Sequence, residues 1–323
     1  MKRHILSIDL GATNIECGLV DKNGNVRVKK SCPTGREKGA ETILSNILSV
    51  AREVASEAKS TRCRIIAVSI GTPGAVDQKT GRIIGGAPNI PGWKGVPLVP
   101  ALKKEFSLPT FASNDVTLYA LGEAMFGAGK GKKDIVCLAL GTGIGGGIVI
   151  GGKIYRGAID GAGEAGHTTV KLDGRKCKCG SLGCLERYAS ATAIAELGKR
   201  SSRKNRKSLI RKLAGGDEER ITAKVVFDAA KQGDKTAKEI VEKVGWYLGA
   251  GIANLINILN PEMVIIAGGV AQAGKVLLEI TRKSIETYAT EVNRKGVEIT
   301  LGKLKTDAGI IGAAALAWEE MEK

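Results

Sequence analysis

The sequence lacks any segment suited to crossing a membrane. It contains no uncharged apolar run of about 18 residues, the length that a spanning helix requires. Residues 1–8 briefly resemble a secretion signal, but Asp9 interrupts the apolar run and no small-residue cleavage site follows. We therefore expect a cytoplasmic protein with no membrane partner.

Aromatic residues are scarce, at 4%, whereas glycine is abundant, with 44 residues among 323. Abundant glycine is typical of tight turns and of places where a ligand approaches the backbone closely. The chain contains no Gly-Lys-Ser or Gly-Lys-Thr, which excludes a P-loop. A phosphate site, if present, must use other glycine segments.

Cysteine and histidine are also few, with 7 and 2 residues. So few cysteines in a long intracellular chain do not indicate a disulfide framework. Cys17, Cys32, Cys63 and Cys137 are scattered, mostly in apolar stretches, and we interpret them as small core residues. The remaining three, Cys177, Cys179 and Cys184, are clustered.

The charge is strongly one-sided. The formal net charge of +16 favours anionic partners such as nucleotides, polyphosphate or nucleic acid. The densest basic stretch is 199–212. We interpret it as a solvated helix face, with a dock for a polyanion as the alternative.

The hydrophobic pattern predicts alternating strands and helices. Strands are expected at residues 4–10, 15–20, 26–31, 65–70, 110–112, 135–140, 148–150, 263–267 and 297–301. Helices are expected at 40–58, 116–126, most of 188–260, 275–289 and 308–321, with loops at 85–100 and 141–147.

Residues 5–13 resemble residues 135–143, since each segment reads as a strand that ends in Leu-Gly and a turn containing Thr. Such an internal echo is expected of a duplicated fold. It predicts two similar α/β domains with a cleft between them.

Residues 141–147 contain five glycines, which would leave backbone N–H groups open to a phosphate. The segment also fits Gly-x-Gly-x-x-Gly, but a strand rather than a helix is expected to follow, so we reject a dinucleotide site. Asp9, Gly11 and Thr13 form a second candidate, because an aspartate at a strand end can hold Mg²⁺. The alternative for that segment is an ordinary turn with a capping aspartate.

His167, Cys177, Cys179 and Cys184 form the strongest local signal. One imidazole and three thiolates complete a tetrahedral zinc site and leave no open position, which indicates a structural metal. The alternative is three free or redox-active cysteines.

Three acids could contribute chemistry. Asp115 follows Asn114 where a strand is expected to meet a helix, and a helix cap is the simpler interpretation. Glu164 and Glu186 flank the predicted zinc ligands. A metal would fix both carboxylates as acceptors for sugar hydroxyls, which cost free energy when left unpaired.

Together these motifs resemble the ROK family of sugar kinases over nearly the whole chain. The matching segments are Asp9–Thr13, Gly71–Gly74, Pro88–Ile90 with Trp93, Asn114–Asp115, Ala120–Glu123, Leu140–Gly147, Gly163–His167, Cys177–Glu186 and Ala267–Gly269. The resemblance implies an actin-like (ribonuclease H-like) α/β fold of two lobes, with ATP and catalytic Mg²⁺ in the cleft and structural Zn²⁺.

The resemblance also implies roles for individual residues. Asp115 matches the catalytic base of the family. The matches to sugar-binding positions are Gly74, Asn89, Asn114, Asp115, Glu164, His167 and Glu186. The nucleotide side comprises Asp9, Gly11, Ala12, Thr13, Gly141, Thr142, Gly143, Gly145, Gly268 and Gly269, the last two facing adenosine.

Two residues of the first phosphate motif depart from the family pattern. Ala12 replaces a glycine and Asn14 replaces a lysine. One added methyl group at residue 12 should preserve phosphate binding, whereas Asn14 removes a positive charge near the phosphates.

The domain prediction assigns residues 1–115, completed by the C-terminal helix 308–323, to an N-terminal lobe and 116–307 to a C-terminal lobe. The predicted activity is phosphorylation of the glucose 6-OH by ATP, in a homo-oligomer (dimer or tetramer) that binds no specific nucleic acid.

Several alternatives stay open. The sugar could be N-acetylmannosamine, fructose or mannose, and the donor could be polyphosphate. A sugar-sensing DNA-binding regulator is a rival of another class, although the first expected strand begins near residue 4 and leaves no room for a helix-turn-helix ahead of it. An actin-like filament protein is more remote.

Overall fold

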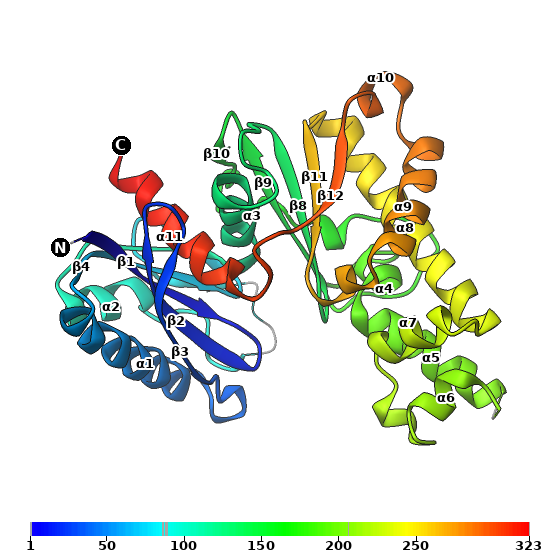
Figure 1. Ribbon diagram of the computed structural model, residues 1–323, viewed down its shortest axis with the longest axis horizontal. Helices are drawn as coiled ribbons and strands as arrows, with labels where there is room; N and C mark the ends of the chain where they lie inside the picture. The colour runs from blue at the N-terminus through cyan, green and yellow to red at the C-terminus, as the bar shows by residue number, and fades with distance from the viewer. Residues whose placement is uncertain (1, 86, 88–89, 206, 323) are drawn as a thin grey trace. The chain divides into compact units, whose positions relative to one another are not determined.

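The computed structural model describes residues 2–85, 87, 90–205 and 207–322, and the chain forms two compact units (Figure 1). Residues 1–133, 147–163 and 303–323 make up the first unit, and 134–146 with 164–302 make up the second. This division differs from the boundary predicted after residue 115, because 116–133 and 147–163 group with the first unit. Among the described residues, no helix is both long and apolar enough to span a bilayer.

The first unit is built on a five-stranded sheet of order β3-β2-β1-β4-β7. Its strands are β1 (Lys2–Leu10), β2 (Asn14–Asp21), β3 (Val26–Pro33), β4 (Cys63–Thr72) and β7 (Thr110–Asn114). The antiparallel strands β1 to β3 follow one another through short turns, and β4 and β7 add in parallel. Asn23-Gly24 makes the β2–β3 turn, where Gly24 has a positive φ of 80°.

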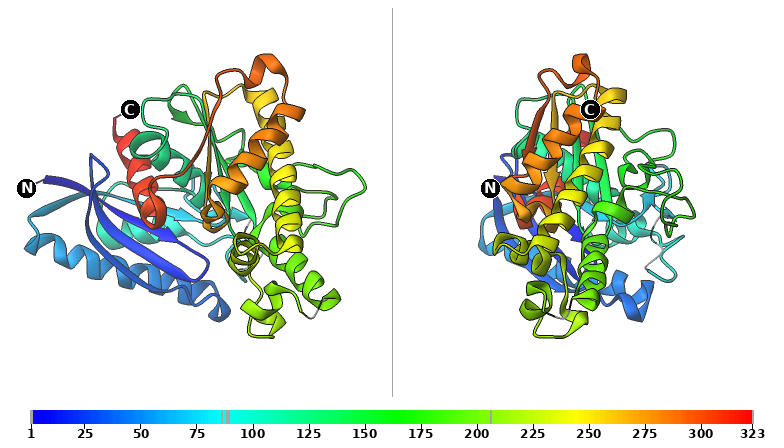
Figure 2. Two further views of the ribbon diagram at one scale, coloured as in Figure 1. Left: turned by 45° about the vertical axis from the view of Figure 1, so that its right-hand side comes forward. Right: turned by 90° about the vertical axis from the view of Figure 1, so that its right-hand side faces the viewer.

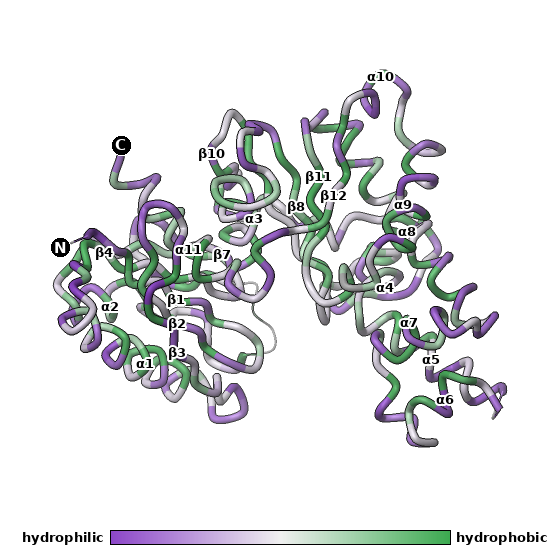
Figure 3. Tube along the Cα trace, viewed as in Figure 1, coloured by the Kyte–Doolittle hydropathy of each residue, from purple (hydrophilic) through white to green (hydrophobic). Residues whose placement is uncertain are grey.

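Helices cover both faces of this sheet (Figure 1). Along β1 successive side chains alternate between the faces. Leu6 and Ile8 therefore pack in one core with α1 (Ala40–Ser60) and α2 (Leu98–Phe106), while Ile5 packs with α11 (Ala308–Met321). Helix α3 (Asp115–Phe126) packs against α11, and β5 (Ala75–Val76) pairs with β6 (Ile83–Gly85). Figure 3 shows the amphipathic pattern of α1.

The second sheet has the order β10-β9-β8-β11-β12. Its strands are β8 (Ile135–Leu140), β9 (Ile144–Ile150), β10 (Lys153–Ile154), β11 (Met263–Ala267) and β12 (Glu298–Leu301). The chain passes from the second unit to the first within β9, after Gly146. β11 lies parallel to both β8 and β12, and all five of its residues are buried.

Helices make up most of the rest of the second unit. They are α4 (Glu186–Ala189), α5 (Ala191–Lys204), α6 (Leu209–Leu213), α7 (Ala223–Lys231), α8 (Lys235–Leu259), α9 (Lys275–Tyr288) and α10 (Glu291–Arg294). The long helix α8 packs along α9 (Figure 2). Short 3₁₀ turns are η1 (Arg36–Lys38), η2 (Ala165–His167), η3 (Glu218–Arg220), η4 (Gly269–Ala273) and η5 (Lys305–Asp307).

Two predicted loops are shorter in the structure. Residues 98–100 open α2, because a proline is compatible with the first helical turn, where its missing N–H has no intrahelical partner. The glycine loop expected at 141–147 ends at Gly143, since β9 already begins at Ile144. Glycine content alone predicted a loop there, whereas pairing within the sheet holds these glycines in a strand.

Candidate functional site

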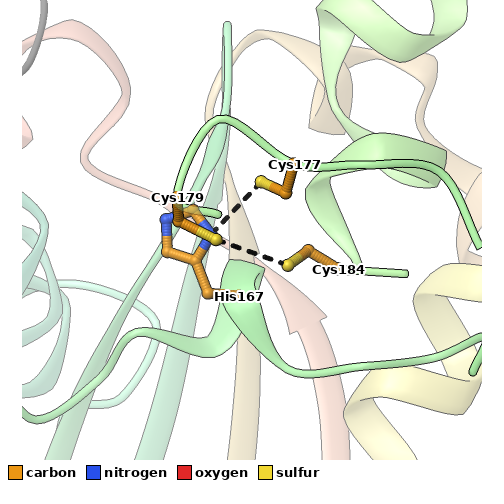
Figure 4. Close-up of side chains that lie close together, drawn as sticks. All are labelled: His167, Cys177, Cys179 and Cys184. Atoms are coloured by element: carbon orange, nitrogen blue, oxygen red, sulfur yellow. Dashed lines mark hydrogen bonds between the residues drawn. The ribbon is translucent and has the colours of Figure 1, made fainter. Parts of the chain in front are cut away.

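The four predicted metal ligands come together in the second unit. The ligand atoms of His167, Cys177, Cys179 and Cys184 all lie within 4.8 Å of one another (Figure 4). The backbone between them closes tightly, with positive φ at Gly180 and Gly183. A side chain on Gly183 would collide with the Lys171 carbonyl at 1.7 Å, so glycine is required there.

The spacing of these atoms fits a tetrahedral metal. Zn–S bonds of about 2.3 Å give a tetrahedron whose edges are about 3.8 Å long. The Cys179 and Cys184 sulfurs are 3.7 Å apart, and Nδ1 of His167 is 3.7 Å from the Cys177 sulfur (Figure 4). The donor chemistry and the separations therefore both suit Zn²⁺, with His167 binding through Nδ1.

The two flanking carboxylates lie beside this cluster. Oε1 of Glu186 is 3.2 Å from the Cys177 sulfur, and Oε2 of Glu164 is 3.8 Å from Nε2 of His167. His167 thus directs Nδ1 to the thiols and Nε2 to Glu164. Glu164 is exposed and Glu186 is half-buried, so both could reach a polar ligand in solution.

The turn between β8 and β9 is the part of the glycine segment that remains a loop. Its ends are tied by the Gly141 N–H, which donates to the Gly143 carbonyl at 2.9 Å. Two residues at the start of α5 hold its other carbonyls, because Ala191 N–H donates to Gly141 and the Thr192 hydroxyl donates to Thr142. These bonds leave a short, fixed turn.

Gly143 connects this turn to Glu186. A Cβ at residue 143 would lie 2.6 Å from Oε2 of Glu186, whereas a Cβ at Gly141 would meet nothing within 4 Å. The Glu186 carboxylate is therefore wedged between the turn and the Cys177 sulfur. A side chain at residue 143 would push this carboxylate away from its present position.

Later glycines of the segment serve packing. A Cβ on Gly147 would lie 2.4 Å from that of Ala120, so this glycine lets β9 approach α3. Gly145, predicted to bind nucleotide, lies within β9 rather than in a loop. The part of the segment that remains a loop is thus 141–143, and because the Gly141 N–H is bonded to the Gly143 carbonyl, a phosphate would have to be met by the later N–H groups of the turn.

The two glycines predicted to face adenosine adjoin the same turn. Gly268 has a positive φ of 84°, and a Cβ there would lie 2.5 Å from the Leu140 carbonyl, directly before Gly141. Gly269 has open space where its Cβ would be. In the second unit the structure brings together the two predicted nucleotide segments.

In the first unit, Asp9 and Asp115 come together around Gly71. A Cβ on Gly71 would lie 3.4 Å from the Cα of Asp115 and 3.5 Å from Oδ1 of Asp9. Asp9 stands near the end of β1, and Asp115 opens α3 directly after β7, so both lie at carboxyl ends of parallel strands that flank β4. Ligands bind at such ends in open α/β sheets.

The surroundings of Asp9 favour its neutral form. Burial of the carboxyl group, followed by the nearby charges of Asp115 and Glu16, raises the pKa of Asp9 to about 7, against the opposing effect of Lys29. Gly309 in α11 packs directly on this carboxylate, since a Cβ there would lie 2.1 Å from Oδ2. A divalent cation would relieve the repulsion between the acids.

The turn at residues 11–13 is exposed at Ala12 and Thr13, and Thr34 anchors it by two hydrogen bonds. The Thr34 hydroxyl donates to the Gly11 carbonyl at 2.8 Å, and the Thr34 N–H donates to the Thr13 carbonyl at 2.8 Å. The turn therefore has room for a ligand, although Asn14 in β2 offers no positive charge.

The helix cap at this junction is Asn114, whereas the sequence offered that role for Asp115, which is the first residue of α3. Its Oδ1 accepts from the N–H groups of Val116 and Thr117, and its Nδ2 donates to the Gly74 carbonyl at 3.3 Å. Asn114 and Gly74, both predicted to bind sugar, are thus in contact. Asn89, the remaining predicted sugar residue, lies outside the described residues.

Sequence reasoning missed residues that act through packing. Gly71 and Gly309 admit the carboxyl group of Asp9, Gly166 lets the 164–167 segment lie on the Ile144 carbonyl, and Thr192 holds the glycine turn. The recurring Gly-x-x-Gly spacing of Gly309 and Gly312 was an available signal, because small residues on one helix face permit close approach.

The sequence matches a known protein family and is similar to proteins of known name. The model described as ROK family matches residues 5–320. A glucokinase from Thermotoga maritima is 40% identical over 321 residues, covering 99% of each chain. A xylose repressor from Caldicellulosiruptor bescii is 32% identical over 98% of this chain and 78% of its own.

A solved structure is also closely similar. The ROK family glucokinase from Streptomyces griseus, in complex with glucose and AMPPNP, superposes with a TM-score of 0.85 at 34% identity. The match covers 98% of this chain and 99% of that one.

Proposed function

The chain belongs to the ROK family, and on that premise we propose that it is an ATP-dependent glucokinase that phosphorylates the 6-OH of glucose. The family fixes the actin-like duplicated α/β fold, which agrees with the matching strand orders of the two sheets. The observation that carries the proposal is full-length similarity to glucokinases, combined with carboxylates held beside a His/Cys cluster and a fixed glycine turn.

Asp115 is proposed as the general base. It would accept the proton of the 6-OH as that oxygen attacks the γ-phosphorus of ATP in line. Such a base contributes roughly 10²–10⁴-fold to the rate. Asn114 caps α3 and contacts the Gly74 carbonyl, so the segment that carries Asp115 is fixed before substrate arrives.

Glu164, His167 and Glu186 are proposed to bind the sugar hydroxyls, together with Asn114. Zn²⁺, when bound by His167, Cys177, Cys179 and Cys184, supplies rigidity to the loop that carries these groups. Because Nδ1 of His167 faces the thiols, its Nε2 remains available to a hydroxyl or to Glu164.

The nucleotide is proposed to bind through the turns at 11–13 and 141–143, with Gly268 and Gly269 on the adenosine side. Asp9 would hold Mg²⁺, which neutralises phosphate charge when bound. Phosphoryl transfer depends mostly on alignment and charge neutralisation, which these fixed turns suit.

A panel of sugars and donors tests the proposal. Glucose, mannose, fructose and N-acetylmannosamine would each be offered with ATP or polyphosphate, and product formation measured. We expect the highest kcat/KM for glucose with ATP. A higher value for another sugar would reassign the substrate, and turnover with polyphosphate alone would reassign the donor.

The basic stretch gives little reason to favour polyphosphate. Lys199 pairs with Glu219 at 2.6 Å and Arg203 with Glu218 at 2.7 Å, while Arg211 lies 3.6 Å from the same Glu218. Two acids thus pair with three of the eight basic residues of the stretch, which is typical of a solvated helix face. The similarity to a repressor keeps DNA binding as an outcome to check by operator titration.

A further inference from the structure

A second cysteine–histidine pair lies in the first unit, at the end of the sheet where β1 and β4 begin. Nε2 of His4 is 3.6 Å from the Cys63 sulfur, and the two residues are only 4% and 6% exposed. Neither residue has a part in the proposed kinase site, since Asp9 stands near the opposite end of β1 and Asp115 follows β7.

The hydrogen bonds of His4 define its tautomer. Nδ1 lies 2.9 Å from the Lys2 carbonyl, which can only accept, so Nδ1 carries the proton of the neutral ring. Nε2 is then the acceptor and faces the thiol. A cysteine whose proton can pass to an adjacent imidazole is an activated nucleophile.

An irregularity in the sheet accompanies this pair. The register between β1 and β4 shifts between His4 and Ile5, because His4 pairs with Ile65 and Ile5 with Ala67. Such bulges change the direction of nearby side chains and recur beside functional sites. The Thr61 carbonyl, 3.6 Å from the Cys63 sulfur, is a second acceptor for the thiol proton.

Both residues are among those that line a cavity of about 790 Å³. The same cavity is lined by Lys2, Arg27 and Arg62. Its acidic lining residue is Asp21, whose carboxylate accepts bonds from the Asn23 and Asn25 backbone and from the Asn25 amide. Three cations against one acid favour an anionic ligand.

We propose that Cys63 is a thiol-exchange site for a small anionic disulfide. The thiol proton passes to Nε2 of His4, and the Cys63 sulfur attacks one sulfur of the disulfide. The disulfide bond breaks as a new sulfur–sulfur bond to Cys63 forms, and the other half leaves as a thiolate. Lys2, Arg27 and Arg62 bind the anionic groups of the disulfide.

The test uses the full-length, zinc-loaded protein and the dianionic disulfide 5,5′-dithiobis(2-nitrobenzoate). Release of its coloured thiolate gives the rate, and peptide mass mapping gives the modified cysteine. We expect the first adduct on Cys63, ahead of Cys32, which is more exposed but has no histidine partner among the described residues. Because this mapping is done on the wild-type protein, the result does not depend on whether a variant folds.

Variants and a second reagent separate the parts of the proposal. Cys63→Ser should abolish the fast phase, and His4→Gln should slow it at least about tenfold, since a glutamine accepts a hydrogen bond but takes up no proton. Lys2→Gln with Arg27→Gln should slow the dianionic reagent severalfold and leave neutral 2,2′-dithiodipyridine unaffected. A first adduct on any other cysteine, or equal slowing of both reagents, would overturn the proposal.

Discussion

The two sheets share one plan and differ in chemistry. The order β3-β2-β1-β4-β7 of the first sheet corresponds strand for strand to β10-β9-β8-β11-β12 of the second. In each, a strand ending in Leu-Gly turns into an antiparallel partner and has a parallel neighbour on its other side. The duplication suggested by residues 5–13 and 135–143 is present in the structure.

The residue before the shared leucine marks the difference. Asp9 occupies this place in β1, opposite Gly71, whereas Ala139 occupies it in β8, opposite Ala267. The first unit thus brings two acids together, and the second brings together a glycine turn, a carboxylate and four side chains that could hold a metal ion. One scaffold supports two kinds of site because the differences are confined to strand ends and loops.

The largest effect on activity is expected from the acids of the first unit. Asp115→Asn should lower kcat by roughly 10²–10⁴-fold and leave glucose affinity nearly unchanged, because an amide cannot accept the proton. Asp228→Asn, a change at a half-buried residue of α7 that pairs with Lys224, is the control and should retain full activity. Wild-type turnover by the Asp115 variant would remove this residue from the role of base.

The predicted metal ligands of the second unit should show the next largest effect. Cys184→Ser removes a fully buried ligand, and we expect zinc affinity to fall by about 100-fold or more, since even outer-shell changes cost 10–100-fold. Metal analysis and thermal unfolding would both report the loss. Cys32→Ser is the matched control, and equal zinc content in the two variants would exclude Cys184 as a ligand.

The glycine turn offers a matched pair of substitutions within the second unit. Gly143→Ala should displace Glu186, because the new methyl group would lie 2.6 Å from its carboxylate, whereas Gly141→Ala adds a methyl group into open space. Losing a charged hydrogen bond costs about 1.5–3 kcal/mol, so glucose affinity should fall roughly 10- to 100-fold in the first variant alone. Equal glucose affinities would show that Glu186 does not depend on Gly143.

The acid pair of the first unit should appear in the pH dependence of stability. The pKa of Asp9 is raised to about 7 in the folded protein, so the native state binds a proton that the unfolded state releases near pH 4. Without Mg²⁺ or nucleotide, this group should make stability fall as the pH rises from about 4 to about 7. Asp9→Asn should remove that contribution.

Denaturant unfolding at pH 5 and pH 8 measures this effect. We expect Asp9→Asn to stabilise the protein more at pH 8 than at pH 5, where Asp9 is already neutral. The same difference between wild type and variant at both pH values would contradict the assigned pKa.

Local patterns predicted much of this molecule. The bounds of β8 and β11 follow directly from apolar runs closed by glycine, and those of α11 from its apolar run. The spacing of His167 and the three cysteines predicted that they would meet. The start of β9 and the helix after Pro97 were missed. Both depend on tertiary packing, such as the approach of Gly147 to Ala120, which a sequence pattern does not contain.

The site was predictable in its residue types and less so in its arrangement. Nothing in the sequence linked Glu186 to Gly143, or Asp9 to Gly309, since each pair is distant along the chain. Such contacts arise because glycines allow close approach between segments that only the fold brings together.

The most direct test is calorimetric titration of glucose into zinc-loaded and chelator-treated protein, with metal content measured in both. We expect one Zn²⁺ per chain. After its removal, glucose should bind at least tenfold more weakly, which corresponds to a loss of about 1.4 kcal/mol of binding free energy or more. Metal-free protein that binds glucose as tightly as the untreated sample would contradict it.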